Sequence, residues 1–131
     1  MTVANLVNES ESFMDGDDSI VIVENLEQFR GGRTLDVTGF APDIIKAGHV
    51  IITDGDGVYK PMPLNGGGDA YAALPEGHSY VGVLVATIRK ARPFASIMVR
   101  GTVNPVAAPF GMASILAAFK ADVPLVLFRA D

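Results

Sequence analysis

The chain contains no cysteine, which excludes a disulfide framework and any metal site built on thiolates. It also lacks a Gly-x-Ser-x-Gly sequence, the strained turn that presents the nucleophile of many hydrolases. Lysine and arginine are missing from residues 1–29, which hold seven acids. Since these residues contribute −7 to a total charge of −5, residues 30–131 contribute +2. The sequence therefore predicts an acidic arm on a nearly neutral body.

The apolar content is high for a chain of 131 residues, which is the size of one domain. Hydrophobic residues make up 49% of the chain and the mean hydropathy is +0.32. A small domain has a limited interior, so this surplus indicates apolar surface that is covered between subunits. No basic stripe with interleaved aromatic residues occurs, and we expect no nucleic-acid partner.

A membrane partner is not expected either. The first 25 residues carry no basic residue, so they lack the positively charged start of a secretory signal. The uncharged run 101–119 is long enough to raise the question of a spanning helix. Asn104, Pro105, Pro109 and Gly111 interrupt this run, which excludes a membrane span.

The stretch Tyr80–Val103 is the centre of the predicted fold. Two apolar runs rich in β-branched residues flank a basic tip at residues 89–93, a pattern that predicts two antiparallel strands. Neither face of the first run is polar, whereas a strand buried on one side alternates apolar and polar residues. We therefore expect cover on both sides, from the same domain and from another subunit. The candidate subunit contacts are Val81, Val83 and Val85, which share one face.

Shorter elements are predicted before this stretch. Apolar and alternating runs predict strands at residues 20–23 and 33–37 and on either side of a turn at Ala47-Gly48 within 44–52. Residues 24–30 have the pattern of a helical turn closed by two glycines. Residues 53–57 predict a tight hairpin turn, and 61–75 an irregular loop with Gly66, Gly67 and Gly68 at its most flexible point.

The period of the apolar residues changes near the C-terminus. Met112, Ile115, Leu116 and Phe119 follow helical spacing, which predicts an amphipathic helix over 110–121 with this face in the core. Pro124 ends the helix, and 125–128 (LVLF) predicts a final buried strand. The predicted fold is mainly β: a small barrel or sandwich-like domain of short antiparallel strands, with one C-terminal helix and a final strand. We predict an arm at 1–19 and one domain at 20–131.

Residues that could support catalysis or metal binding are few. The sequence 54–57 (DGDG) lacks the later oxygen ligands of a calcium loop, so a hairpin turn is the favoured interpretation. His49 and His78 each follow a glycine, and both are interpreted as residues at the start of a strand rather than as catalytic groups. We expect no enzyme and no cofactor. The alternative is a small β-barrel ligand-binding domain or enzyme that uses His49 and His78 with Asp54 or Asp56.

The acidic arm has two open interpretations. The β-type run Ile20–Val23 can add to an exposed strand edge of another protein, or it can form one more strand of its own domain. The basic tip at Arg89, Lys90 and Arg92 is favoured as a solvated hairpin tip. Its alternatives are contact with an acidic partner or with the acidic arm of the same chain.

The order of these features resembles the capsid decoration proteins of tailed bacteriophages, of the lambda head-stabilising type. The resemblance covers residues 33–131 and is a pattern rather than one motif. It includes IIKAGHVIITDGDGVYKP upstream, then GVLVA at 82–86, MVRGTV at 98–103, an Asn-Pro link, the helix from Phe110 and the strand from Leu125.

The resemblance implies a compact, mostly β protein without enzymatic activity. Members of that family sit as trimers at local three-fold positions on the outer surface of an icosahedral capsid and clamp the major capsid protein. The implied location is the virion, after synthesis in the host cytoplasm, and the implied partners are the major capsid protein and two further copies of the chain. The N-terminal arm would supply capsid-binding residues, for which the candidates are Val3, Leu6, Val7, Ile20, Val21, Ile22 and Val23. Another phage structural module, such as a head fibre base or a tail component, is a further alternative.

Overall fold

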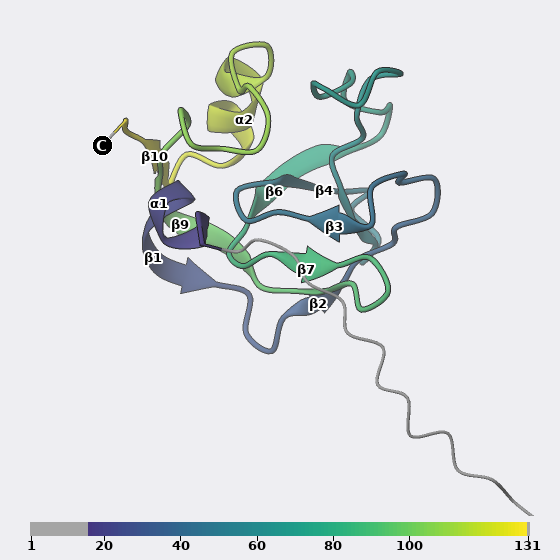
Figure 1. Cartoon of the computed structure of the whole chain (residues 1–131), viewed down its shortest axis with the longest axis horizontal. Coiled ribbons are helices and arrows are strands. Elements are labelled where there is room, and N and C mark those ends of the chain that lie inside the picture. The colour runs from purple at the N-terminus through teal and green to yellow at the C-terminus, as the bar shows by residue number, and fades with distance from the viewer. Residues whose placement is uncertain (1–15, 131) are drawn as a thin grey trace, which may run out of the picture.

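The computed structural model describes residues 16–130 of the chain. The helices are α1 (Asp18–Val21) and α2 (Leu116–Asp122). The strands are β1 (Ile22–Gln28), β2 (Arg33–Thr34), β3 (Ile44–Ile45), β4 (Val50–Thr53), β5 (Tyr59–Pro61), β6 (Ser79–Leu84), β7 (Ile88–Arg89), β8 (Phe94–Ala95), β9 (Ile97–Val103) and β10 (Val126–Phe128). The predicted mainly β fold, with a late helix followed by a final strand, is confirmed (Figure 1).

One central sheet organises the described part of the chain. Its strand order is β1-β9-β6-β4-β5, and all of these neighbours are antiparallel. β10 joins this sheet by pairing parallel to β9. The predicted hairpin of the central stretch is present, because Val83 and Leu84 of β6 pair with Met98 and Ile97 of β9. Its connecting residues also pair elsewhere: β7 with β3, and β8 with β2.

The central sheet separates two apolar cores. Successive side chains of a strand point to opposite faces, so Val83 enters one core and Leu84 the other. Ile52 and Ile51 of β4 divide in the same way, and each of these four side chains is fully buried. The prediction that this stretch is covered on both faces is confirmed. The cover comes from the chain itself.

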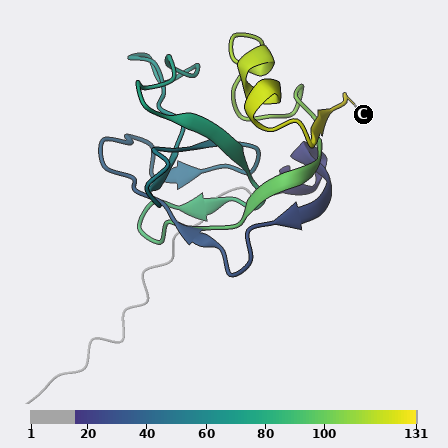
Figure 2. The same cartoon turned by 180° about the vertical axis from the view of Figure 1, so that it is seen from behind.

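Different elements cover the two faces. Helix α2 lies over the first core, where Phe119 is fully buried and Asp122 accepts a hydrogen bond from the Tyr80 backbone N–H at 3.1 Å. The two small sheets β2-β8 and β3-β7 cover the second core through buried residues such as Leu35 and Ile45. Figures 1 and 2 show this arrangement, with α2 and the small sheets on opposite sides of β6.

Close backbone contact between β6 and β9 depends on a glycine. A Cβ atom added to Gly82 would collide with the Met98 carbonyl oxygen. The backbone of β9 therefore lies where a side chain at this position would be, and Val83 and Leu84 enter the two cores immediately beyond it.

Several turn predictions are confirmed. Gly48 adopts a φ of +87° between β3 and β4, so the Ala47-Gly48 turn is where the sequence placed it. Residues 53–57 connect β4 to β5 as a hairpin, in which the Asp54 carboxylate accepts the Asp56 N–H at 2.8 Å. The favoured interpretation of this stretch as a hairpin turn therefore agrees with its structure.

The N-terminal predictions need correction. Ile20 and Val21 belong to α1 rather than to a strand, and β1 starts only at Ile22. The predicted helical turn at 24–30 is wrong, because β1 continues to Gln28 along the full length of β9. Residues 24–28 are extended because they pair with β9, a strand distant in sequence, and this pairing outweighs their weak local preference for a helical turn.

Three further boundaries differ from the prediction. The predicted strand at 33–37 is reduced to β2 at Arg33–Thr34, followed by a single bridge between Leu35 and Tyr59. Helix α2 starts at Leu116 rather than at Phe110, because a turn at 112–115 replaces its first half. Met112 and Ile115 are still buried, so the predicted core face is confirmed. The final strand is not fully buried, as Leu125 and Leu127 are exposed.

Helix α1 is fixed to the body by one acid and one apolar side chain. The Asp18 carboxylate accepts two hydrogen bonds from Thr87, from the backbone N–H at 2.8 Å and from the hydroxyl at 2.6 Å. The Thr87 hydroxyl oxygen in turn accepts the Ala47 N–H at 3.1 Å. Val21 is 3% exposed and lies directly over Gly48, where a Cβ atom would collide with it. The last residues of the predicted arm are therefore part of the folded body.

We predict that Asp18→Ala lowers the free energy of unfolding by about 2 kcal/mol, since hydrogen bonds to a charged group contribute more than neutral ones. Denaturant unfolding measures this change. The matched control is Asp17→Ala, whose carboxylate makes no hydrogen bond that caps the helix and whose loss should cost less than about 0.5 kcal/mol. Equal effects of the two substitutions would contradict the role given to Asp18.

We predict that Val83→Asp destabilises the chain by about 4 kcal/mol or more, because it buries a charge without a partner in a core position that is 0% exposed. Soluble yield and circular dichroism report the loss of fold. Ala86→Asp, two residues beyond β6 at an exposed position, should fold normally. A folded and soluble Val83→Asp protein would show that this face is not buried.

Candidate functional site

An exposed group of leucines lies at one corner of the central sheet, where β1, β9 and β10 meet. Leu26 of β1 is 55% exposed, Leu127 of β10 is 55% exposed, and Leu125 before β10 is 62% exposed. We call Leu26, Leu125 and Leu127 the leucine face. Single exposed leucines are common on proteins, but these three lie on or beside strands that both pair with β9, which makes them a candidate contact surface.

Strand register places these leucines on the outer side of the sheet. Leu127 lies beside Thr102 and Thr102 lies opposite Glu24, so the three form one row across β10, β9 and β1. The inner side of the same corner packs into the first core through Val103, Val126 and Phe128. Leu26 falls in a register irregularity between Asn25 and Glu27, which directs its side chain away from the core.

The leucine face adjoins the start of the described chain. Helix α1 leads directly into β1, and Ile20 within α1 is 52% exposed. Figures 1 and 2 both show α1, β1, β9 and β10 gathered at the same end of the molecule. β1 also forms an outer edge of the sheet, and its exposed side chains include Glu24 and Glu27. An acidic strand edge and an apolar face therefore lie together at this corner.

The candidate arm residues divide into three groups. Val3, Leu6 and Val7 lie outside the described residues. Val21 is buried in the first core, so in the folded chain its side chain is covered and offers no surface for a partner. Ile20 is exposed, while Ile22 and Val23 are half-buried at the start of β1. For these three residues contact with a partner stays a prediction.

The candidate subunit contacts need two corrections. Val83 is fully buried by its own chain, which leaves its side chain no area to offer to another copy. The three valines do not share one face, because Val81 packs against the second core and Val83 and Val85 against the first, beyond a register shift between β4 and β6. Val81 and Val85 are half-buried. A subunit contact through Val81 and Val85 stays a prediction. The central stretch carries less free apolar surface than its sequence suggests.

His49 is a structural residue of the core. It is 1% exposed and surrounded by the rings of Phe40, Tyr71 and Phe110 at centroid distances of 5.4, 5.2 and 5.6 Å. Its Nε2 lies 3.0 Å from the Met62 carbonyl oxygen, which only accepts, so Nε2 carries the proton and donates. Burial lowers the pKa of His49 to about 4, despite the opposing effect of this hydrogen bond.

The two histidines do not form a pair. His49 precedes β4, whereas His78 precedes Ser79, which lies opposite Thr53 at the far end of β4. A strand of this length separates them by roughly 15 Å. Asp54 lies near His78, but its carboxylate accepts the N–H groups of Asp56 and Val58, which lower its pKa. This arrangement supplies a stable turn rather than a general base with a raised pKa.

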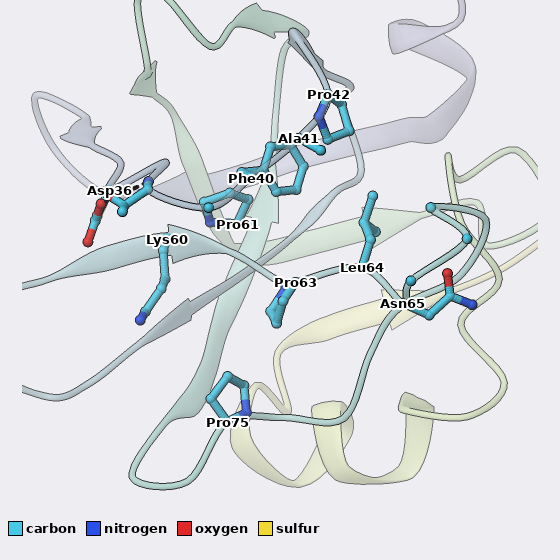
Figure 3. Close-up of a pocket in the computed structure, with 15 residues that line it drawn as sticks. Asp36, Phe40, Ala41, Pro42, Lys60, Pro61, Pro63, Leu64, Asn65 and Pro75 are labelled. Atoms are coloured by element: carbon cyan, nitrogen blue, oxygen red, sulfur yellow. Dashed lines mark hydrogen bonds between the residues drawn. The ribbon is translucent and has the colours of Figure 1, made fainter.

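A pocket with a volume of about 480 Å³ lies between the loop at 36–42, β5 and the loop at 63–68. Figure 3 shows prolines from separate segments around it: Pro42, Pro61, Pro63 and Pro75. Its titratable lining residues are Asp36 and Lys60. Hydrogen bonds from Thr38 hold the pKa of Asp36 below its usual value, so the carboxylate is a fixed anion. The Thr38 side chain is hydrogen-bonded to this carboxylate, but the lowered pKa makes Asp36 a weak general base.

The basic tip is partly tied to the loop beside it. The Lys90 ammonium donates to the carbonyl oxygens of Phe40 and Ala41 at 3.0 and 3.3 Å and lies 3.8 Å from the Asp43 carboxylate. A second groove, of about 400 Å³, is lined by Val37, Thr38, Asp43, Arg89, Lys90 and Ala91. The tip therefore has a defined shape as well as a positive charge.

Two further observations concern the described residues alone. Between residues 16 and 130, no group of three or more histidine, aspartate and glutamate side chains is placed to hold a metal ion. In the same range, no helix has the length and apolar content needed to cross a membrane. The uncharged run 101–119 is divided between the end of β9, a loop and the start of α2.

No protein-family model, curated protein or solved structure matches this chain. The function proposed below therefore rests on the exposure, charge and strand arrangement of the described residues, together with the sequence resemblance.

We predict that acid destabilises the protein through His49. Its pKa is about 4 in the folded chain and close to 6.5 when unfolded, so the folded state binds fewer protons between these values. The stability that depends on neutral His49 is fully present above pH 6.5. As the pH falls towards 4, the free energy of unfolding decreases by up to about 3 kcal/mol. In His49→Gln this part of the pH dependence should vanish, as denaturant unfolding at several pH values would show. His78→Gln is the control and should keep it; an unchanged pH dependence in His49→Gln would contradict the assignment.

Proposed function

We propose that this chain is a structural protein that decorates the outer surface of a tailed-phage capsid, as a trimer bound to the major capsid protein. The order of strands, helix and final strand that carries the resemblance is consistent with the observed fold. The observation that supports the proposal most is the leucine face, because it is an exposed apolar surface on a body whose own cores are already closed. Such a protein acts through contact area and needs neither catalysis, nor a cofactor, nor nucleic acid, nor a membrane.

The leucine face is the proposed contact with the major capsid protein. It adjoins α1, which carries the exposed Ile20. A partner with apolar side chains and a basic rim fits it, because Glu24 and Glu27 border the leucines on β1.

Trimer formation would strengthen the binding of the leucine face to the capsid. Three copies that bind three capsid subunits at once convert later contacts into intramolecular ones, which raises the overall affinity without any new interaction. The half-buried Val81 and Val85 are the remaining candidates for contact between copies. A ring of three requires two different surfaces on each copy, which leaves the leucine face free for the capsid.

Electron cryo-microscopy of virus particles assembled from the genome that encodes this chain tests the proposal. The expected result is density for the chain at local three-fold positions on the outside of the head. Density at the tail or at the base of a head fibre would assign the chain to another structural module. Particles that lack the chain, together with a monomer that binds a small ligand, would contradict the proposal.

We predict that the double substitution Leu125→Glu and Leu127→Glu leaves the chain folded and weakens capsid binding about tenfold or more. Both side chains are already exposed in the free chain, so their loss removes contact area rather than core packing. Co-sedimentation with undecorated capsids measures the affinity. Val58→Glu, at the β4–β5 turn on the opposite edge of the sheet, is the control and should bind normally. If the unmodified chain, the double variant and Val58→Glu all bind equally, the leucine face is not the contact with the capsid.

A further inference from the structure

A small apolar pocket of about 260 Å³ lies between the β3–β4 turn and the loop that follows β9. Two polar side chains, Lys46 and His49, belong to its lining. A cavity of about 150 Å³ with apolar walls is enough to hold a benzene ring, so this pocket has room for one aromatic ring with small substituents. Its apolar walls come from two segments far apart in sequence, with Phe40, Pro42 and Ile44 from the first and Pro109 and Phe110 from the second.

The walls of this pocket are fixed by the contacts of the β3–β4 turn. The backbone N–H of His49 donates to the Lys46 carbonyl oxygen at 3.1 Å, which closes the turn, and Gly48 within it has a φ of +87°. A Cβ atom added to Gly48 would lie 3.2 Å from Cδ of Pro109, so the turn and the loop after β9 are in close contact. The pocket is therefore formed by the folded chain itself, as ligand sites usually are.

His49 supplies a free hydrogen-bond acceptor to this pocket. Its Nε2 donates to the Met62 carbonyl oxygen, whereas its Nδ1 makes no hydrogen bond within residues 16–130. Nδ1 is not among the unpaired atoms of this range that are sealed from solvent, so it borders the open space of the pocket that His49 lines. Burial lowers the pKa of His49 to about 4, so at pH 7 this nitrogen is unprotonated and can only accept. The rings of Phe40 and Phe110 stand at 90° to the imidazole, so a donor that reaches Nδ1 does so in aromatic surroundings.

Lys46 supplies a positive charge at the mouth of the pocket. Its side chain is exposed and makes no hydrogen bond or ion pair within the described part of the chain. Lys46 and His49 are the two ends of one turn, and the flexible four-carbon stem of a lysine lets its ammonium group reach over the opening. The site therefore combines a space for one ring with an acceptor inside and a cation at the edge.

We propose that this pocket binds a small aromatic compound with a hydroxyl group at one end and an acidic group at the other. The ring lies among Phe40, Ile44 and Phe110, the hydroxyl donates to Nδ1 of His49, and the acidic group pairs with Lys46. This site shares no residue with the leucine face, so the inference does not depend on the proposed capsid contact. Ligand binding alone does not contradict that contact, which fails only if the chain is also absent from virus particles.

Titration of the full chain with para-hydroxyphenylacetate at pH 7, followed by NMR, tests the site. We expect saturable shifts of the amide signals of Ile44, Lys46, His49 and Phe110, with a Kd on the order of 1 mM or below. The Nδ1 signal of His49 should move upfield as this nitrogen accepts the hydroxyl proton. Phenylacetate lacks the hydroxyl and should bind about tenfold more weakly, because it leaves Nδ1 without a donor.

Three results would overturn the proposal. The first is the absence of saturable shifts up to about 10 mM of para-hydroxyphenylacetate. The second is a set of shifts confined to the leucine face or to the proline-lined pocket, which would place the ligand elsewhere. The third is equal affinity for the two compounds, which would show that the hydroxyl has no partner in the site.

Two lysine substitutions provide the matched comparison. Lys46→Ala alters an exposed side chain and should weaken the binding of para-hydroxyphenylacetate about threefold, because an exposed ion pair contributes little. The same variant should bind phenol, which has no acidic group, as the unmodified chain does. Lys60→Ala removes one positive charge beside the proline-lined pocket and should leave both affinities unchanged. Equal weakening in the two variants, or none in Lys46→Ala, would contradict the contact between Lys46 and the acidic group.

Discussion

Burial of β4 and β6 on both faces is the constraint from which the rest of the structure follows. A strand with two apolar faces needs two covering layers, and this chain provides them from its own residues. Helix α2 and β10 complete one core, while β2-β8 and β3-β7 complete the other. The close approach at Gly82 keeps β6 and β9 together between the layers.

This burial changes where exposed apolar surface is found. The sequence predicted such surface at the central stretch, with Val83 as a contact between subunits. A strand with two apolar faces does not show from its sequence whether its own chain or another copy covers it. The structure covers that strand within the chain and leaves exposed leucines at the β1-β9-β10 corner instead. The proposed surface contact therefore uses a different set of side chains from the set that the sequence predicted. His49 is enclosed by aromatic rings and lies at the far end of β4 from His78, so the fold does not bring the two histidines together.

Local signals explain which parts of the fold could be predicted. The β3–β4 and β4–β5 turns were predicted because glycine and aspartate determine them within a few residues. Helix α1 was missed, since Val21 is held by Gly48 and Asp18 by Thr87, partners far away in sequence. The leucine face was missed for a related reason. An apolar run such as LVLF looks the same in a strand buried on both faces as in a strand with one free face, and only the fold shows that Leu125 and Leu127 are left exposed.

Hydrogen exchange of the isolated chain, followed from micromolar to near-millimolar concentration, tests most directly whether one chain closes both cores. The account predicts that amides of β4, β6 and β9, including Ile51, Val83 and Leu84, are the slowest to exchange and that their protection does not depend on concentration. Protection of β6 that disappears on dilution would contradict it, because the strand would then require another copy for its cover.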